Sequence, residues 1–199
     1  MKVGLALAFA SAFAACAGPR PAVVRPVPEL RGDIAVLPFN SMSTSLRGPQ
    51  LLRELTQQKL SGFGWDPVPL EAADAALRGI GISDGGQLRS IASEKVAAAL
   101  GVDRYVVGMV NDFSDQNLGF VRRRIVELEL SVVDGKSGET LWKNTGRFEK
   151  SKAALSRKKA ELSFLEGVLE NAAEKAYGKP MDQESRQAVD RAMMSFPRR

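Results

Sequence analysis

Residues 120–142 decide the fold: FVRRRIVELELSVVDGKSGETLW reads as one long strand over 120–134, then a tight turn and a return strand. Apolar and polar residues alternate along the first strand, which is typical of a sheet with one buried and one wetter face. The alternating residues are Val126, Leu128, Leu130 and Val132 on one side, and Glu127, Glu129 and Ser131 on the other. Asp134-Gly-Lys-Ser-Gly138 predicts a hairpin turn, with the return strand over 139–149.

Upstream of this hairpin, helices and strands alternate. The apolar run over 34–39 predicts a buried first strand, and Pro49 is typical of the first position of a helix, which Gly62 and Gly64 then end. Residues 65–70 contain Pro67 and Pro69 and predict an edge strand or an extended loop. A short helix is predicted over 71–79, and a second helix, capped by Asp84 and Gln87, over 84–100. A strand is then predicted over 104–113, followed by a polar turn over 114–119.

Downstream of the hairpin, two helices are predicted. Leucines and alanines three and four residues apart indicate a helix over 162–176, and Asp182 is predicted to cap a last helix. The inner side of that last helix would carry Val189, Ala192, Met193 and Phe196. The order β-α-β-α-β-β-β-α-α predicts an α/β fold with a mixed β-sheet flanked by helices.

The amino terminus predicts export. Lys2 precedes an uncharged apolar run over 3–15, which is short for a membrane span and typical of a signal peptide. Phe13-Ala-Ala-Cys16 resembles the lipobox of bacterial lipoproteins, with Phe13 where Leu is usual. We therefore expect a lipoprotein signal peptide over 1–15 and lipidation of Cys16; the alternative is an ordinary secretory signal. Residues 16–32 are proline-rich and predict an extended tether, which leaves 33–199 as a single domain.

Composition excludes several kinds of chemistry. The chain of 199 residues has no histidine and one cysteine, which excludes Ser-His-Asp and Cys-His mechanisms, histidine metal sites and an intrachain disulfide. The net charge of +5 suits anionic lipid or acidic glycans at least as well as nucleic acid, and export disfavours nucleic acid as a partner. We expect no cofactor and no metal.

Few side-chain patterns suggest a site. The glycines over 79–86 do not have the spacing of a phosphate-binding loop and predict a flexible loop. Four polar residues could hold calcium but are more typical of a turn: Asn111, Asp112, Asp115 and Asn117. Ser163 and Lys159 lie four apart and could form a dyad on a helix. Trp142 is predicted to fill the core beneath the hairpin, whereas Trp65 could be a surface anchor.

The arginines that open the long strand are the candidate interaction surface. Arg122 and Arg124 share one face of a strand, and Arg123 lies on the other. The favoured interpretation is a solvated sheet edge; the alternative is docking to lipid phosphates or to an acidic partner. Basic residues at 150, 152 and 157–159 could converge with them in space.

Three sequences together resemble a group of envelope lipoproteins: IAVLPF at 34–39, GVDRYVVGMV at 101–110 and LSVVDGKSGETLW at 130–142. The group includes the family typified by a meningococcal surface antigen, the curli-secretion lipoprotein, the outer-membrane activator of a penicillin-binding protein, and the TolB amino-terminal domain. The resemblance covers most of residues 33–177. It implies an anticodon-binding-like domain that is tethered to the outer membrane and acts by binding, without catalytic residues. It does not extend to pore formation, because no long lipid-facing hairpin is evident.

The functional prediction is a non-catalytic binding, assembly or regulatory module of the cell envelope. Its expected partners are membrane lipid, through acylated Cys16, and another envelope protein; a homo-oligomer is also compatible. Ala17 follows the cysteine instead of Asp, so the resemblance implies the outer membrane, with the domain facing the periplasm or exposed at the cell surface. The alternatives are a subunit of an oligomeric secretion or transport apparatus, and an enzyme that acts on an envelope polymer.

Overall fold

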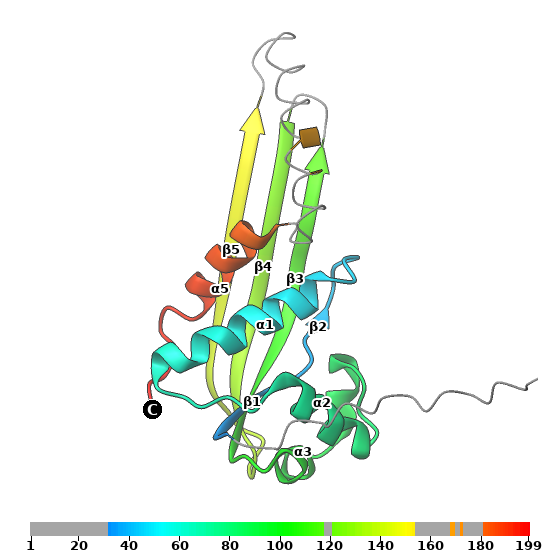
Figure 1. Cartoon of the computed structure of the whole chain (residues 1–199), viewed down its shortest axis with the longest axis vertical. Helices are drawn as coiled ribbons and strands as arrows, with labels where there is room; N and C mark the ends of the chain where they lie inside the picture. Colours follow the sequence, from blue (N-terminus) through cyan, green and yellow to red (C-terminus); the bar gives the residue numbers. More distant parts are fainter. Residues whose placement is uncertain (1–31, 118–120, 154–167, 170–171, 173–180) are drawn as a thin grey trace, which may run out of the picture.

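The computed structural model describes residues 32–117, 121–153, 168–169, 172 and 181–199. A five-stranded mixed sheet lies at the centre, in the order β1-β3-β4-β5, with β2 also paired to β3. Its strands are β1 (Ile34–Val36), β2 (Asn40–Ser41), β3 (Arg104–Asn117), β4 (Val121–Asp134) and β5 (Thr140–Ala153). Both β1 and β2 run parallel to β3, whereas β4 runs antiparallel to β3 and β5 (Figure 1). The predicted mixed sheet flanked by helices is confirmed.

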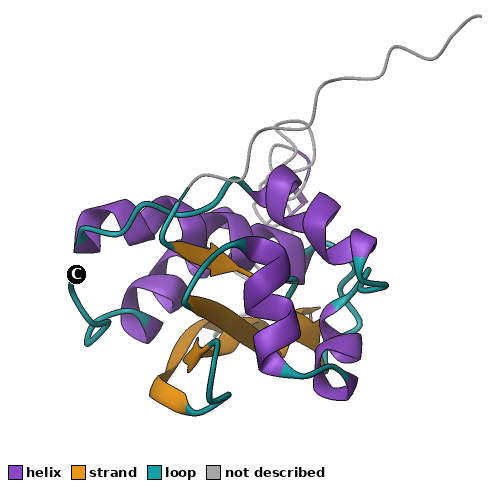
Figure 2. Ribbon diagram, turned by 90° about the horizontal axis from the view of Figure 1, so that it is seen from below, coloured by secondary structure: helices purple, strands orange, loops and turns teal. Residues whose placement is uncertain are grey.

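Helices cover both faces of this sheet. Residues of α1 (Gly48–Leu60) and α5 (Asp182–Ala192) pack with Val106, Val126 and Leu128 in one hydrophobic cluster. We call the face that they cover the inner face, and the opposite one the outer face. Residues of α2 (Leu70–Gly79) and α3 (Ser93–Leu100) pack with Tyr105 and Val133 in a second cluster, at the lower end of the outer face (Figures 1 and 2).

The first strand connects these two clusters. Side chains of successive strand residues point to opposite faces, and β1 is buried on both. Ile34 and Val36 join the inner cluster, while Ala35 and Leu37 join the outer one. The predicted buried first strand is therefore confirmed, although β1 ends at Val36; the Leu37 amide still donates to the carbonyl oxygen of Val106, and the ladder resumes at β2.

Two glycines are required by geometry. A Cβ on Gly146 would lie 2.1 Å from the carbonyl oxygen of Ala188, so only glycine lets α5 pack this closely on β5. Gly138 ends the hairpin turn with φ of +73°, a left-handed conformation that favours glycine. The predicted turn is confirmed: Asp134 Oδ1 accepts hydrogen bonds from the backbone amides of Lys136 and Ser137.

Several predicted boundaries are wrong. Residues 65–69 form the extended loop that was one of the two predicted alternatives, with an isolated bridge between Pro67 and Ile34, but Leu70 already belongs to α2. The helix predicted over 84–100 is divided into the 3₁₀ helix η2 (Gly85–Ser90) and α3, with extended residues at 91–92. The polar turn predicted at 114–119 is strand as far as Asn117, since cross-strand ion pairs stabilise polar residues there.

The helices agree in part with the prediction. α1 begins one residue before Pro49, and a further 3₁₀ turn, η1 (Ser61–Phe63), ends at Gly64 as expected. Asp182 does not cap α5: the N-cap is Met181, in a left-handed conformation, and Asp182 instead pairs with Arg186. The residues predicted for the inner side are buried as expected: Val189 and Ala192 in α5, and Met193 and Phe196 just beyond its end. Of the helix predicted over 162–176, only residues 168–169 and 172 lie in the described part, and they are helical.

Candidate interaction surfaces

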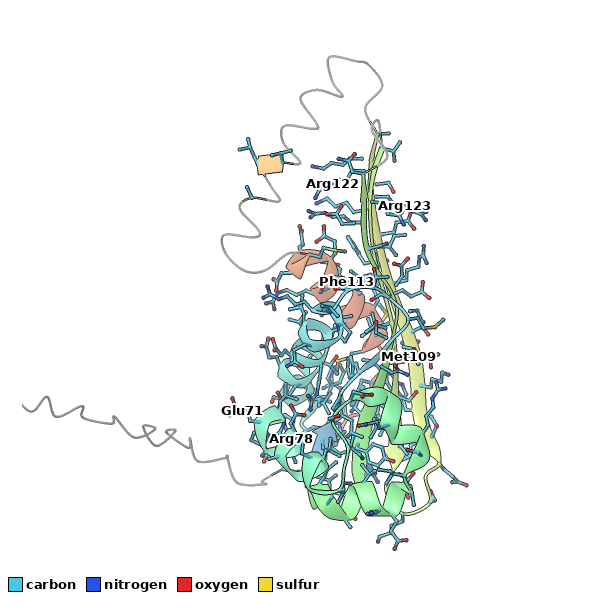
Figure 3. All side chains as sticks on the ribbon, turned by 90° about the vertical axis from the view of Figure 1, so that its right-hand side faces the viewer. Glu71, Arg78, Met109, Phe113, Arg122 and Arg123 are labelled. Carbon is cyan, nitrogen blue, oxygen red and sulfur yellow. The ribbon has the colours of Figure 1, made fainter. Side chains whose placement is uncertain are left out.

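The three consecutive arginines are divided between the two faces of the sheet. Arg122 points to the inner face and Arg123 to the outer face (Figure 3). However, β4 is hydrogen-bonded on both sides, to β3 and to β5. The interpretation of these residues as a solvated sheet edge is therefore wrong.

Arg124 belongs to a buried charge cluster on the inner face, and its side chain is 4% exposed. Its Nε donates to Asp115 Oδ2 at 3.2 Å, and its Nη1 donates to Glu184 Oε1 at 3.2 Å. Glu184 comes from the first turn of α5 and is equally buried, and Lys150 Nζ lies 3.8 Å from the same Oε1 atom. These contacts attach α5 to the sheet, so Arg124 has a structural role.

Arg122 lies two residues before Arg124 in β4, on the same face of the sheet. It makes a bidentate pair with Asp115, at 3.0 Å from Nε to Oδ1 and 2.8 Å from Nη2 to Oδ2. Burial raises the pKa of Asp115, but the hydrogen bond from Arg122 and the charges of both arginines outweigh it and hold the pKa below its usual range. The carboxylate of Asp115 is thus engaged in ion pairs with Arg122 and Arg124. Among the described residues, no group of three or more acidic or cysteine side chains could hold a metal ion.

Some of the predicted basic residues do converge. In the β4–β5 register, Arg124 lies opposite Lys150 and Arg122 lies opposite Lys152. The basic residues at 157–159 and the Ser163–Lys159 pair lie outside the described residues, as does Cys16.

The upper outer face carries a network of exposed ion pairs. Arg123 Nε donates to Glu149 Oε1 at 2.6 Å, Arg147 Nη2 donates to Glu149 Oε2 at 2.9 Å, and Arg147 Nη1 donates to Glu127 Oε2 at 2.5 Å. The hydrogen bonds from Arg123 and Arg147 lower the pKa of Glu149 to about 2. The charges of this face are therefore balanced among themselves.

A groove of about 300 Å³ lies lower on the outer face. Its floor is formed by β3 and β4, and includes Tyr105, Val107, Met109 and Ser131. Its wall is formed by η2 and α3, through Leu88, Arg89, Ser93 and Val96. Figure 3 shows Met109 pointing away from the side of the sheet that carries Phe113 and α1.

Two nearly buried residues of this groove present hydroxyl groups to it. Tyr105 is 5% exposed and Ser131 is 8% exposed. Within the described part of the chain, neither hydroxyl makes a hydrogen bond. Glu129 also lines the groove, but it is paired with Lys143 at 2.8 Å. The groove therefore combines apolar surface with free hydroxyl groups.

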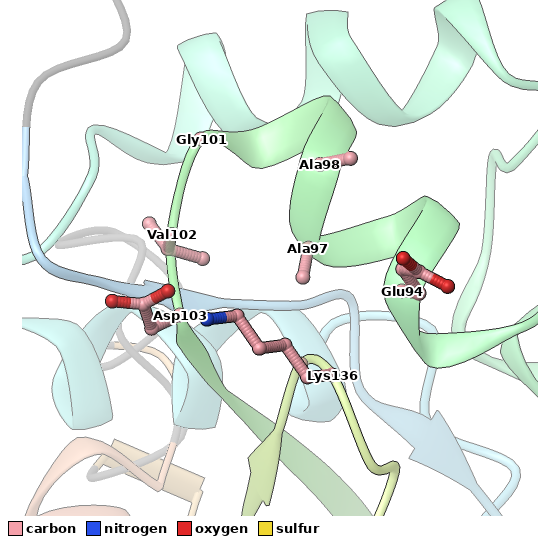
Figure 4. A pocket seen from close by; sticks show the side chains of 8 residues that line it. Glu94, Ala97, Ala98, Gly101, Val102, Asp103 and Lys136 are labelled. Atoms are coloured by element: carbon pink, nitrogen blue, oxygen red, sulfur yellow. The ribbon is translucent and has the colours of Figure 1, made fainter.

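A second cavity, of about 360 Å³, lies at the lower end between α3 and the β4–β5 turn. Its sides carry Glu94, Asp103 and Lys136, around Ala97 and Val102 (Figure 4). The three charged side chains are exposed and make no ion pair with other described residues. Water solvates such groups well, so this cavity shows weaker signs of a ligand than the groove does.

The glycine-rich segment over 79–86 uses its amides internally. Asp84 Oδ1 accepts a hydrogen bond from the amide of Gly86, and Gln87 Oε1 accepts one from the amide of Asp84. This is the predicted capping box, although it caps η2. A carboxylate thus occupies the place that a phosphate would take at a helix start.

The two tryptophans differ from the prediction. Trp65 is 6% exposed and its Nε1 donates to the carbonyl oxygen of Pro197 at 2.8 Å, so the interpretation as a surface anchor is wrong. Trp142 is only partly buried and packs edge-on against Phe196, with 4.8 Å between ring centroids.

The described helices include none that is long and apolar enough to cross a membrane.

Comparisons with known proteins agree with this fold. The sequence profile of the GNA1162-like lipoproteins matches residues 31–195, which is most of the chain. The chain belongs to the GNA1162-like lipoprotein family. The resemblance inferred from the three sequence motifs is thereby confirmed. No curated protein sequence matches this family member significantly.

One solved structure of low identity shares this fold, and two further structures show a weaker likeness. Lipoprotein GNA1162 from Neisseria meningitidis is 17% identical, with a TM-score of 0.57 over 72% of this chain and 99% of that one. PelC from Paraburkholderia phytofirmans, solved as a dodecamer, is 10% identical, with a TM-score of 0.47 over 87% of this chain and 93% of that one. LpoB from E. coli is 14% identical, with a TM-score of 0.45 over 61% of this chain and 57% of that one.

The groove and Glu184 were both missed by sequence reasoning. Alternation along β4 places Ser131 on the wetter face, but only the packing of η2 and α3 encloses it. Glu184 carries no local signal, because its partner Arg124 is 60 residues away in the sequence.

Proposed function

We propose that this lipoprotein is a membrane-anchored, non-catalytic binding module that docks another envelope protein through the outer face of its sheet. The observation that carries the proposal is the outer-face groove, where apolar side chains lie beside hydroxyl groups without partners. A site of this composition can contact a partner through burial and through hydrogen bonds that form only on binding.

The distribution of charge supports binding over catalysis. The carboxylates near the three arginines of β4 are engaged in ion pairs: Asp115 with Arg122, Glu184 with Arg124, and Glu149 with Arg123 and Arg147. The groove contains one carboxylate, Glu129, and Lys143 pairs with it. The chain has no histidine to serve as a general base near pH 7.

The membrane placement is part of the same proposal. Cys16 would carry the lipid, residues 16–32 would form the tether, and the outer membrane would be the destination because Ala17 follows the cysteine. The domain would then face the periplasm, within reach of other envelope proteins. Membership of a lipoprotein family supports the anchor.

Site-directed photo-crosslinking in the native envelope tests the binding function. A photoreactive residue at Met109, on the floor of the groove, should yield a defined adduct with one other envelope protein. The same residue at Gln58, which is exposed on α1 at the opposite side of the sheet, is the control and should yield none. Adducts of this chain with itself alone would favour an oligomeric apparatus. Equal, diffuse adducts from both positions would contradict the proposal.

A further inference from the structure

The chemistry of the outer-face groove indicates what kind of group it holds; this inference rests on the proposed binding function. We propose that the groove binds the carboxy-terminal end of a partner polypeptide, with an aliphatic last side chain on the floor and the terminal carboxylate at the wall formed by η2 and α3. Four features of the groove lead to this ligand.

The first feature is the pair of hydroxyl groups. Tyr105 on β3 and Ser131 on β4 lie on the outer face and are diagonal neighbours. Tyr105 pairs with Val133, which is two residues after Ser131 in β4. Both residues are more than nine-tenths buried, and neither hydroxyl has a hydrogen-bond partner among the described residues. Neither oxygen is among the fully buried polar atoms that lack a partner, so both hydroxyl groups reach the open groove and are free to form hydrogen bonds with a ligand there.

The second feature is a cation without an ion-pair partner. Arg89 is exposed on the wall and makes no ion pair within the described residues, whereas the acidic Glu129 is already paired. The same wall contains Ser93, the first residue of α3, and no side chain caps that helix. Uncapped amides at a helix start carry partial positive charge and favour an anion. A carboxylate therefore suits the wall better than an amine or a neutral group.

The third feature is the aliphatic surface next to these donors. Val107 and Met109 on the floor and Leu88 on the wall are only partly buried, so apolar area is left for a ligand to cover. No aromatic ring other than that of Tyr105 lines the groove. An aliphatic side chain fits this surface, and methionine adapts to its shape.

The fourth feature is size. A volume of about 300 Å³ is at the lower end of the usual range for ligand pockets. Asn40 of β2, Gly85 of η2 and Gly138 of the β4–β5 turn contribute to the lining. A depression of this volume has room for a terminal residue but not for a long segment of chain. Capture of a terminal carboxylate by amide, hydroxyl and cationic donors is a recurrent mode of peptide recognition.

Methyl NMR of the mature, lipidated protein in nanodiscs tests the proposal. With ¹³C-methyl methionine, Met109 reports on the groove, while Met42 and Met194, which are 76% and 79% exposed, serve as internal controls. The probes are acetyl-Gly-Ser-Ala-Ala-Leu and acetyl-Gly-Ser-Ala-Ala-Val with free carboxylates. Each should shift the Met109 signal saturably and leave Met42 and Met194 in place. The matched amides should bind about tenfold more weakly, as should the free acid that ends in Ser.

Variants then assign the contacts. Tyr105→Phe and Ser131→Ala each remove one hydroxyl and should weaken binding at least fivefold, without lowering the melting temperature, because neither hydroxyl has a partner to lose. Arg89→Gln should bring the acid and the amide probes to equal affinity. Ser151→Ala, on the same face beyond the groove, and Arg78→Gln, exposed on α2, are the matched controls and should bind like the parent.

Each outcome decides the matter. Saturable binding of the free acids, lost in the three groove variants, supports the proposal. No shift of Met109 at millimolar peptide, equal binding of acid and amide by the parent, or unchanged binding by all three variants overturns it. Crosslinking from Met109 to a partner that none of the peptides mimics would overturn this inference and leave the proposed binding function intact. Absence of any crosslinked partner would instead contradict the function.

Discussion

Arg124 and Glu184 form a buried ion pair, with 3.2 Å between Nη1 and Oε1 and side chains that are 4% and 2% exposed. The pair joins the middle strand of the long three-stranded part of the sheet to the last helix. Below it on the inner face, Val126, Phe113 and Phe148 are apolar and lie in register across the three strands. The ion pair thus lies where the apolar interior gives way to charged residues.

We expect Arg124→Met to lower the free energy of unfolding by about 3–5 kcal/mol. The reason is that Glu184 would stay buried without the arginine, and its nearest described cation would be Lys150, with Nζ 3.8 Å from Oε1. Glu184→Leu should cost less, since Asp115 still pairs with Arg124. The double variant should be less destabilised than the sum of the two. Urea denaturation measures all three, and strict additivity would contradict a direct coupling.

The sequence predicted regular elements well where the period was strong. The alternation along β4 and the spacing of Ala188, Val189 and Ala192 in α5 each reflect one buried side, which the local sequence pattern shows directly. The sequence did not predict that β3 extends to Asn117, because Asp115 and Asn117 are residue types that are typical of turns. Only their cross-strand partners, Arg124 and Arg122, explain why they remain in a strand.

Sites were predicted less well, because they depend on tertiary contacts. The face shared by Arg122 and Arg124 follows from strand geometry, but burial of Arg124 requires a helix that arrives from the far end of the chain. The groove likewise needs η2 and α3 to fold back over the wetter face. Ser131 looks like an ordinary solvent-facing residue until that wall is in place.

The ion-pair network on the upper outer face should make stability depend on pH in a defined window. Glu149 has a pKa of about 2 in the folded protein and 4.5 ordinarily, so its ionised form is favoured by folding. Its contribution should be complete above pH 4.5 and disappear as the pH falls from 4.5 toward 2. Denaturation midpoints measured across that range should fall less steeply in Glu149→Gln than in the parent.

Glu139→Gln is the control for this effect. It removes the same charge from an exposed carboxylate that has no ion pair among the described residues. Its pH dependence should match that of the parent. A direct NMR titration that placed the Glu149 midpoint near 4.5 would refute the role of Arg123 and Arg147.

The two tryptophans should differ in stability. Trp65→Ala should cost about 3–5 kcal/mol, because the ring is buried in the inner cluster and its N–H bonds the carbonyl oxygen of Pro197. Trp142→Ala should cost less, since its ring is only partly buried. Trp65→Phe, which keeps most of the apolar area, should lose about 1 kcal/mol for the hydrogen bond. Thermal melts would rank the three variants, and the reverse order for the two alanine variants would mean that the core lies elsewhere.

The lipid anchor is the prediction on which the membrane role depends, and it rests on residues 1–17 alone. Cys16→Ser should abolish incorporation of labelled palmitate, and should either release the protein from membranes or leave the precursor uncut. Phe13→Leu restores the residue that is usual in a lipobox, so it should keep both lipidation and processing and serves as the matched control. Membrane association and processing that survive Cys16→Ser unchanged would show that the cysteine carries no lipid.

The destination is a separate consequence of the residue after the cysteine. Ala17→Asp introduces the residue that often retains lipoproteins in the inner membrane. The lipidated variant should therefore move from outer-membrane to inner-membrane fractions on a sucrose gradient, without any change in lipidation. A parent protein already found in the inner membrane would contradict the proposed location. It would leave the anchor itself standing, because lipid attachment depends on Cys16, whereas sorting depends on the residue at position 17.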